Sequence, residues 1–80
     1  MNWKTFAQEI PNENETVWLY NSTNKFVALG CHVWVDEECG WNWALSDGIV
    51  YCENGKIVAE CEIDEDYVFT HWSRLPDLPE

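Results

Sequence analysis

The sequence predicts a mostly β protein, a small antiparallel meander of about five strands. The clearest evidence is Asn54-Gly55, a pair that favours two-residue hairpin turns because both positions tolerate positive φ. Segments rich in β-branched and aromatic residues alternate with short polar turns, as expected for strands. The chain has 80 residues and no repeat or linker-like stretch. We therefore expect residues 1–80 to form a single compact domain.

The N-terminal half begins with apolar residues at helical spacing. Trp3, Phe6 and Ile10 fit one helical stripe, which allows a short helical turn before Pro11. Two strands are predicted next, around a polar turn: Val17–Asn21 and Lys25–Val35. Within the longer strand, Gly30 is expected to mark a bend or a bulge.

The C-terminal half is predicted to contain a short strand, a hairpin and a last strand. Turns are expected at 36–40, 46–48 and 64–66, and the strands between and after them are Trp41–Leu45, Ile49–Glu53, Lys56–Ile63 and Tyr67–Trp72. A turn at Asn54-Gly55 places three pairs opposite each other: Glu53 and Lys56, Cys52 and Ile57, and Val50 and Ala59. One face of the hairpin is expected to be the buried one, and it carries Val50, Cys52, Ile57, Ala59, Cys61 and Ile63.

Four cysteines raise the question of a metal site or a disulfide. They are Cys31, Cys39, Cys52 and Cys61, and no Cys-x-x-Cys pair occurs among them. In the predicted hairpin, Cys61 lies about 13 Å along the strand from the partner of Cys52, too far for a disulfide. A contact between Cys31 and Cys39 is left open. We expect small core thiols in a reducing compartment, and neither a metal ion nor another cofactor.

The chain is strongly acidic. Fifteen Asp and Glu residues against four Lys and Arg residues give a formal net charge of -11. Such a chain repels nucleic acid and anionic lipid, so we expect no direct binding to either. The sequence also contains neither a long apolar run nor an export signal, and we expect a cytoplasmic protein.

Motifs near both ends resemble a known protein family. Trp3 is followed by Ile10-Pro11, and the chain closes with Thr70-His71-Trp72-Ser73-Arg74-Leu75-Pro76. This pattern resembles a widespread family of short phage and prophage proteins of unknown function. They typically open with Trp, six residues and Leu-Pro, and close with Thr-His-Trp-x-x-Leu-Pro-x-Pro. Arg74 replaces the usual Pro, and Leu78 interrupts the proline-rich end. The resemblance implies a phage origin, and hence the host cytoplasm, but no activity.

The favoured function is protein–protein interaction. His71 has no nucleophile and no orienting carboxylate at a recognisable spacing, so we expect no enzymatic activity. The acidic residues instead predict a carboxylate face for a basic host protein, one that normally binds nucleic acid and would be inhibited or modulated. The residues predicted to form this face are Glu60, Glu62, Asp64, Glu65, Asp66, Asp36, Glu37 and Glu38.

Two alternatives remain open from the sequence. Trp34, Trp41 and Trp43 could line a pocket for a small neutral or cationic ligand. Because six Trp residues are many for so small a core, however, their burial is the default expectation. An apolar sheet face or an unpaired strand edge could also make the protein a homo-oligomeric structural component.

Overall fold

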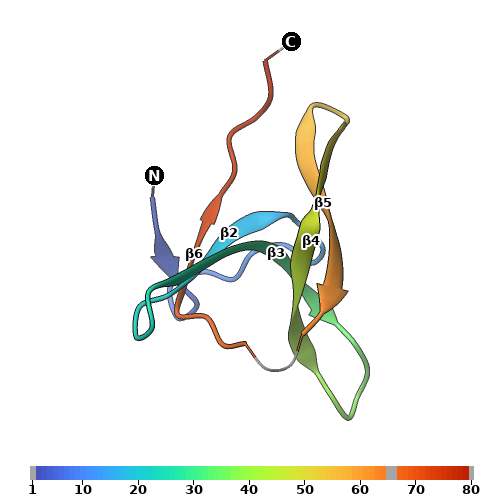
Figure 1. Cartoon of the computed structure of the whole chain (residues 1–80). Helices are drawn as coiled ribbons and strands as arrows, with labels where there is room; N and C mark the ends of the chain where they lie inside the picture. Colours follow the sequence, from blue (N-terminus) through green and yellow to red (C-terminus); the bar gives the residue numbers. More distant parts are fainter. Residues whose placement is uncertain (1, 65–66, 80) are drawn as a thin grey trace.

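Six strands form one antiparallel sheet in the order β1-β6-β2-β3-β4-β5 (Figure 1). The computed structural model describes residues 2–64 and 67–79. The strands are β1 (Lys4–Thr5), β2 (Val17–Asn21), β3 (Phe26–Trp34), β4 (Trp41–Glu53), β5 (Lys56–Ile63) and β6 (His71–Arg74). Strands β2 to β5 follow one another as a meander, which confirms the predicted fold class. The last strand, β6, then returns to lie between β1 and β2.

Strand β4 is continuous through the segment that was predicted to be a turn. Ser46 Oγ accepts the N–H of Gly48 at 3.0 Å, and Asp47 Oδ1 accepts the N–H of Ile49 at 3.1 Å. These bonds produce a bulge in which three residues, Asp47 to Ile49, lie opposite Glu60 alone. The predicted chain reversal is therefore wrong, because the same turn chemistry here only bends a strand that stays paired with β5.

The hairpin register is confirmed, but its predicted burial is only partly correct. Asn54 and Gly55 have φ values of 52° and 76°, as the turn requires, and the three predicted strand pairs form. Ala59 is buried and its N–H bonds to Thr16 Oγ1 at 3.2 Å. Ile63, at the last residue of β5, is exposed, as are Val50 and Cys52 on β4. The loop that contains Thr16 reaches β5, whereas Val50 and Cys52 lie on the other strand of the hairpin.

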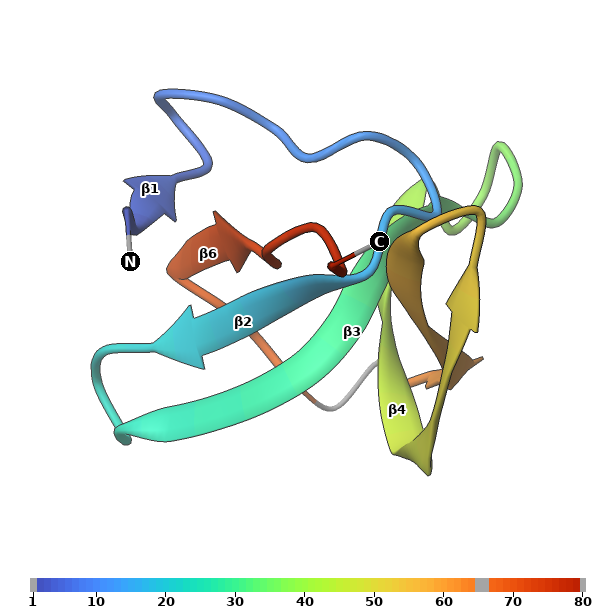
Figure 2. The same ribbon diagram turned by 90° about the horizontal axis from the view of Figure 1, so that it is seen from above.

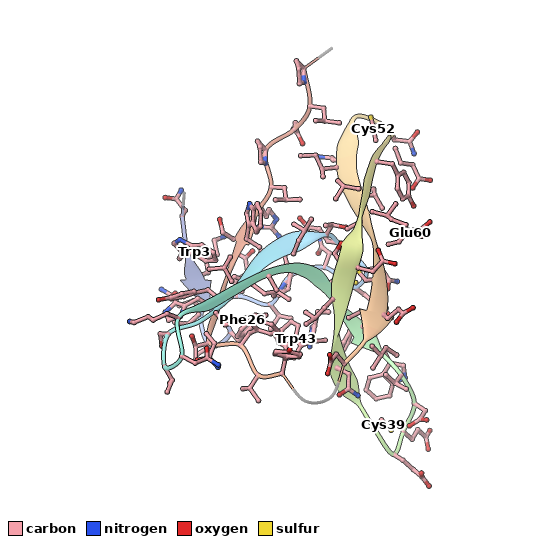
Figure 3. The ribbon with its side chains drawn as sticks, in the orientation of Figure 1. Trp3, Phe26, Cys39, Trp43, Cys52 and Glu60 are labelled. Carbon is pink, nitrogen blue, oxygen red and sulfur yellow. The ribbon has the colours of Figure 1, made fainter. Side chains whose placement is uncertain are left out.

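The main core lies on one face of the sheet. Val17, Leu19 and Trp72 are fully buried and pack with Phe69. Partly buried residues that surround them are Phe6, Phe26, Ala28, Trp43 and Leu45. Figure 3 shows Phe26 and Trp43 on the same side of β3. This face is closed by residues from distant parts of the chain, since Phe6 precedes β2 and Phe69 precedes β6.

Gly30 marks a close approach between strands, and β3 has no bulge there. It pairs with Val17 on one side and Leu45 on the other without a register shift. A Cβ atom at this position would lie 2.3 Å from the carbonyl oxygen of Ala44 and 3.0 Å from Leu19 Cδ1. The position therefore requires glycine because the neighbouring strand leaves no room for a side chain.

The two ends of the chain meet in the sheet. Strand β1, which was not predicted, pairs with β6 through Lys4–Trp72 and Thr5–His71. The short helical turn that the sequence allowed before Pro11 is a single hydrogen-bonded turn and not a helix. Thr5 O accepts the N–H groups of Gln8 and Glu9 in this turn, at 3.1 and 3.2 Å. The last strand begins at His71, later than predicted, because the segment from Tyr67 to Phe69 is not paired with a neighbouring strand.

The sheet bends strongly at β4. Figure 2 shows the β4–β5 hairpin turned away from the plane of β2 and β3. This bend also brings β5 towards β3 across β4. Within residues 2–64 and 67–79, no helix has the length and apolar character needed to cross a membrane.

Candidate functional site

Strand β5 positions two of the predicted carboxylates side by side. Glu60 and Glu62 are both exposed and, being two residues apart on one strand, point to the same face about 6.8 Å apart. Glu60 projects from β5 on the side away from β2 and β3 (Figure 3). Asp64 follows at the end of the strand, where its N–H bonds to Trp43 O at 2.9 Å. The predicted site residues Glu65 and Asp66 lie outside the described residues.

The β3–β4 turn brings the other predicted acids to the same end of the sheet. Asp36, Glu37 and Glu38 are exposed in the turn that leads into the first residue of β4. The backbone bond between Asp64 and Trp43 lies only two residues further along β4. Figure 1 shows the C-terminal end of β5 and this turn on one side of the molecule. We call Asp36, Glu37, Glu38, Glu60, Glu62 and Asp64 the acidic edge.

Asp36 also holds the turn in shape. Its Oδ1 accepts the N–H of Cys39 at 2.7 Å and that of Glu38 at 2.9 Å. Both bonds lower the pKa of Asp36 below its ordinary value of 3.8, and the bond from Cys39 has the larger effect. The Asp36 side chain is therefore partly structural, whereas Glu37 and Glu38 present their carboxylates from the turn.

The bulge in β4 contributes one acid that sequence reasoning missed. Asp47 is exposed and lies opposite Glu60, next to the acidic edge. In the sequence this residue belongs to Ser46-Asp47-Gly48, which is typical of a surface turn. No local signal indicated that the segment would stay in the sheet and add its carboxylate to this region.

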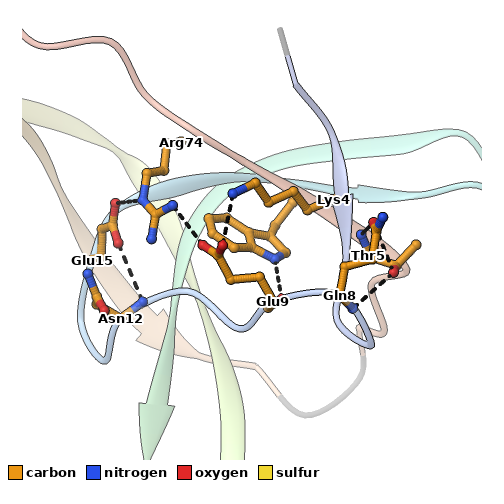
Figure 4. A network of polar contacts seen from close by, with 8 residues as sticks. Lys4, Thr5, Gln8, Glu9, Asn12, Glu15 and Arg74 are labelled. Atoms are coloured by element: carbon orange, nitrogen blue, oxygen red, sulfur yellow. Dashed lines mark hydrogen bonds and ion pairs between the residues drawn. The ribbon is translucent and has the colours of Figure 1, made fainter.

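Three of the four Lys and Arg residues form ion pairs away from the acidic edge. Arg74 bonds to Glu9 at 2.8 Å and to Glu15 at 3.2 Å, and Lys4 bonds to Glu9 at 3.0 Å (Figure 4). The N–H donors of Lys4 and then Arg74 lower the pKa of Glu9 below 4.5.

The other ion pair joins Lys56 and Asp77 near the hairpin tip. Among the described residues, Glu37, Glu38, Asp47, Glu60 and Glu62 take part in none of these pairs. In the part of the chain that the structure describes, ion pairs thus neutralise negative charge near the chain termini, but not at Glu37, Glu38, Glu60 or Glu62.

The tryptophans are less buried than predicted. Of the six, only Trp72 is fully buried, whereas Trp34 and Trp41 are 48% and 49% exposed. These two indoles meet edge to face, with centroids 5.6 Å apart. Trp43 is half-buried and packs on Phe6 with centroids 4.8 Å apart. The predicted ligand-binding tryptophans therefore come from adjacent strands, but the grooves at the hairpin tip and at the bulge are lined by other residues.

His32 is buried between two of these tryptophans. Its ring stacks on Trp41 and packs on Trp43, with both centroid distances 4.5 Å. Its Nδ1 atom is buried and has no hydrogen-bond partner among the described residues. Burial lowers the pKa of His32 from its ordinary value of 6.5, and the nearby charge of Glu13 opposes that shift only in part.

We expect the free energy of unfolding to decrease as the pH falls below 6.5. The unfolded chain gains a proton at that pH, whereas folded His32 accepts it only at a lower pH, so acid favours unfolding. Urea unfolding at about pH 8 and about pH 5.5 would measure the loss. In His32→Phe the loss over this range should be smaller, and an unchanged pH dependence would contradict the assignment to His32.

The cysteines divide into two exposed and two covered thiols. Cys39 and Cys52 are exposed, so the prediction that all four are core residues is wrong for these two. The Cys61 thiol donates to Ala59 O at 3.5 Å, and Cys31 and Cys61 are close enough to affect each other's pKa. Burial raises the pKa of both, that of Cys61 to about 12, and the proximity of Cys31 adds to the latter shift.

Iodoacetamide should therefore distinguish the two classes of thiol. We expect rapid alkylation of Cys39 and Cys52 in the folded protein and slow alkylation of Cys31 and Cys61, since the thiolate is the reactive form. Peptide mass spectrometry would locate the adducts. The same reaction in urea is the control and should label all four, and equal rates in the folded protein would contradict the described packing.

Comparison with known proteins assigns this chain to no family. In the part of the chain that the structure describes, no three His, Cys, Asp or Glu side chains converge as metal ligands would. No protein-family model, curated protein or solved structure matches the chain. The resemblance to short phage proteins stays a prediction, and the conclusion from the site itself is an edge of clustered carboxylates on a bent β sheet.

Proposed function

We propose that this protein acts by protein–protein interaction, with the acidic edge as its contact surface for a basic partner. The observation that carries the proposal is the segregation of charge. The described ion pairs engage Glu9, Glu15 and Asp77, whereas Glu60 and Glu62 stand exposed and unpaired. Carboxylates held in one region by strand geometry attract Lys and Arg more effectively than the same charges spread over a surface.

The chemistry of the partner follows from this surface. A chain with a net charge of -11 repels nucleic acid, but it can compete for a cationic protein groove that otherwise holds phosphates. With the resemblance to phage proteins, the partner would be a basic host protein in the bacterial cytoplasm, inhibited or modulated by occupation of that groove. Such an accessory role requires no catalytic residue and no cofactor.

The proposal is tested by affinity capture from a bacterial lysate with matched charge variants. E60Q/E62Q removes two charges from the acidic edge, and E13Q/E53Q removes two exposed charges elsewhere. The substitutions keep the size of each side chain, so both variants should fold. We expect wild type and E13Q/E53Q to capture the same partner, identified by mass spectrometry, and E60Q/E62Q to capture about tenfold less.

Salt provides a second criterion. Contacts between exposed charges are screened over a Debye length of about 8 Å at physiological ionic strength, so capture should decrease at high salt. The proposal is refuted if E60Q/E62Q captures the partner as well as E13Q/E53Q does, or if the partner recovered is itself acidic. Far-UV circular dichroism of each variant checks that the sheet is intact.

A further inference from the structure

A groove lies where β4 separates from β3. Pairing between these strands covers Gly30 to Trp34 of β3 and Trp41 to Leu45 of β4, and stops there. The bulge then turns β4 away, which leaves a groove of about 590 Å³. Its walls are the first half of β3, the bulge, the end of β5 and Tyr67.

One wall of the groove is the first part of β3, which pairs with no strand on this side among the described residues. Along β3 the peptide groups point alternately to its two neighbours. His32 O accepts the N–H of Asn14 on the β2 side, so the odd-numbered residues of β3 point towards β4. By this alternation the N–H and C=O of Val27 face the groove, where β4 no longer runs beside them. Val27 therefore presents a backbone donor and acceptor to a strand that could add here.

The side chains around this edge combine apolar surface with negative charge. Val27, Val50, Ile63 and Tyr67 line the groove and are 51%, 48%, 51% and 39% exposed. Asp47, Glu62 and Asp64 belong to the same lining, and none of the described lining residues is basic. An exposed apolar surface with a charged rim is typical of an interaction site.

We infer that the groove binds an extended, cationic segment of the partner, which adds as a strand to the free edge of β3. This inference rests on the proposed function and specifies how the partner is held. Main-chain bonds to Val27 would give affinity, while alternate side chains of the segment meet the apolar lining and the rim of Asp47 and Glu62. A second copy of this chain is disfavoured as the occupant because two copies of charge -11 repel each other. A helix could not use the backbone groups of Val27.

Synthetic peptides test the inference without knowledge of the partner. The probe is a fluorescent peptide of about ten residues in which Lys and Val alternate. Two versions carry N-methyl groups on either the valine or the lysine amides, so that each blocks one strand edge while charge and side chains stay. A Lys-Ser peptide keeps the charge and lacks the apolar side chains. We expect at least one methylated peptide, and the Lys-Ser peptide, to bind about tenfold more weakly than the probe in fluorescence anisotropy.

Protein variants locate the binding site. Val27→Ser and Val50→Ser each remove an apolar side chain from the groove wall, and Glu62→Gln removes one charge from its rim. Each variant should bind the probe several-fold more weakly than wild type. Val68→Ser and Glu13→Gln are the matched controls, since both residues are exposed and lie outside the groove. Hydrogen exchange of the Val27 amide should slow when the probe binds, because strand addition protects that group.

Each outcome decides the inference. The inference would be overturned if all the cationic peptides bind equally well, or if Val27→Ser binds the probe as strongly as wild type. It would also be overturned by unchanged hydrogen exchange at Val27, or by concentration-dependent dimerisation that blocks the groove. If E60Q/E62Q still loses the host partner while the peptides bind by charge alone, the proposed function stands and the groove is not the site. If the probe binds at Val27 but E60Q/E62Q captures the host partner as well as wild type does, the groove is a binding site and the proposed function is wrong.

Discussion

Replacing Trp72 with alanine should remove about 3–5 kcal/mol from the free energy of unfolding, the usual cost of truncating a buried Trp. Trp72 is fully buried in the main core, and its Nε1–H donates to Glu9 O at 2.9 Å. Lys4 and Arg74 also lie over its ring, at 5.6 and 4.9 Å from the centroid. A domain of this size has a total stability of about 4–12 kcal/mol, so W72A should lose a large part of that stability.

Urea unfolding followed by far-UV circular dichroism measures this loss without relying on tryptophan emission. Trp34→Ala is the matched control, because the same substitution at a half-exposed indole should cost about 1 kcal/mol or less. Trp72→Phe should fall between the two, since it keeps an aromatic ring but loses the bond to Glu9. Equal losses in W72A and W34A would contradict the central position of Trp72.

The second large effect is expected for Gly30→Ala. The new Cβ would lie 2.3 Å from the carbonyl oxygen of Ala44, and backbone atoms of a paired strand cannot move aside as a flexible side chain can. Overpacking of this kind typically costs about 1–3 kcal/mol, and contact with backbone places this variant at or above the upper end of that range. Urea unfolding gives the loss, and faster amide exchange around Ala44 would locate it between β3 and β4.

Gly40→Ala separates this clash from the general cost of losing a glycine. Gly40 has φ +67° in the β3–β4 turn, and no atom lies within 4 Å of a Cβ placed there. Its replacement should cost about 1–2 kcal/mol, from the left-handed backbone alone. A Gly30→Ala variant no less stable than Gly40→Ala would show that β3 and β4 are not as closely packed as described.

Short-range pairing was the part of the fold most accessible from the sequence. Asn54-Gly55 determines which residues face each other for several positions along the hairpin, because a two-residue turn permits one register. The alternation of Glu60 and Glu62 on one face follows from the same geometry. These features depend only on neighbours in the chain, and they were predicted correctly.

The bulge in β4 and the position of β6 depend on more distant partners. Ser46-Asp47-Gly48 has the same local chemistry whether the chain reverses or bends, and the pairing of both flanking segments with β5 decides between them. Strand β1 has only two residues and forms because β6 offers it an edge. Neither outcome leaves a pattern in the local sequence.

The candidate site was therefore predicted in parts. Glu60 and Glu62 were placed together correctly, but Asp47 was missed, and nothing local indicated that the turn at Asp36 to Glu38 would lie at the end of β5. Burial of the tryptophans could not be predicted either. Trp72 is enclosed because long-range pairing places β6 between β1 and β2, whereas Trp34 is exposed at the last residue of β3, next to the β3–β4 turn.

The return of β6 between β1 and β2 has a consequence for how the protein is made. The segment around Trp72 leaves the ribosome after β1 to β5, yet it separates the first two strands and covers Val17 and Leu19. Until it emerges, the nascent polypeptide can form the β4–β5 hairpin but not a closed interior. A product terminated before β6 would therefore expose the apolar residues of the main core to chaperones and proteases.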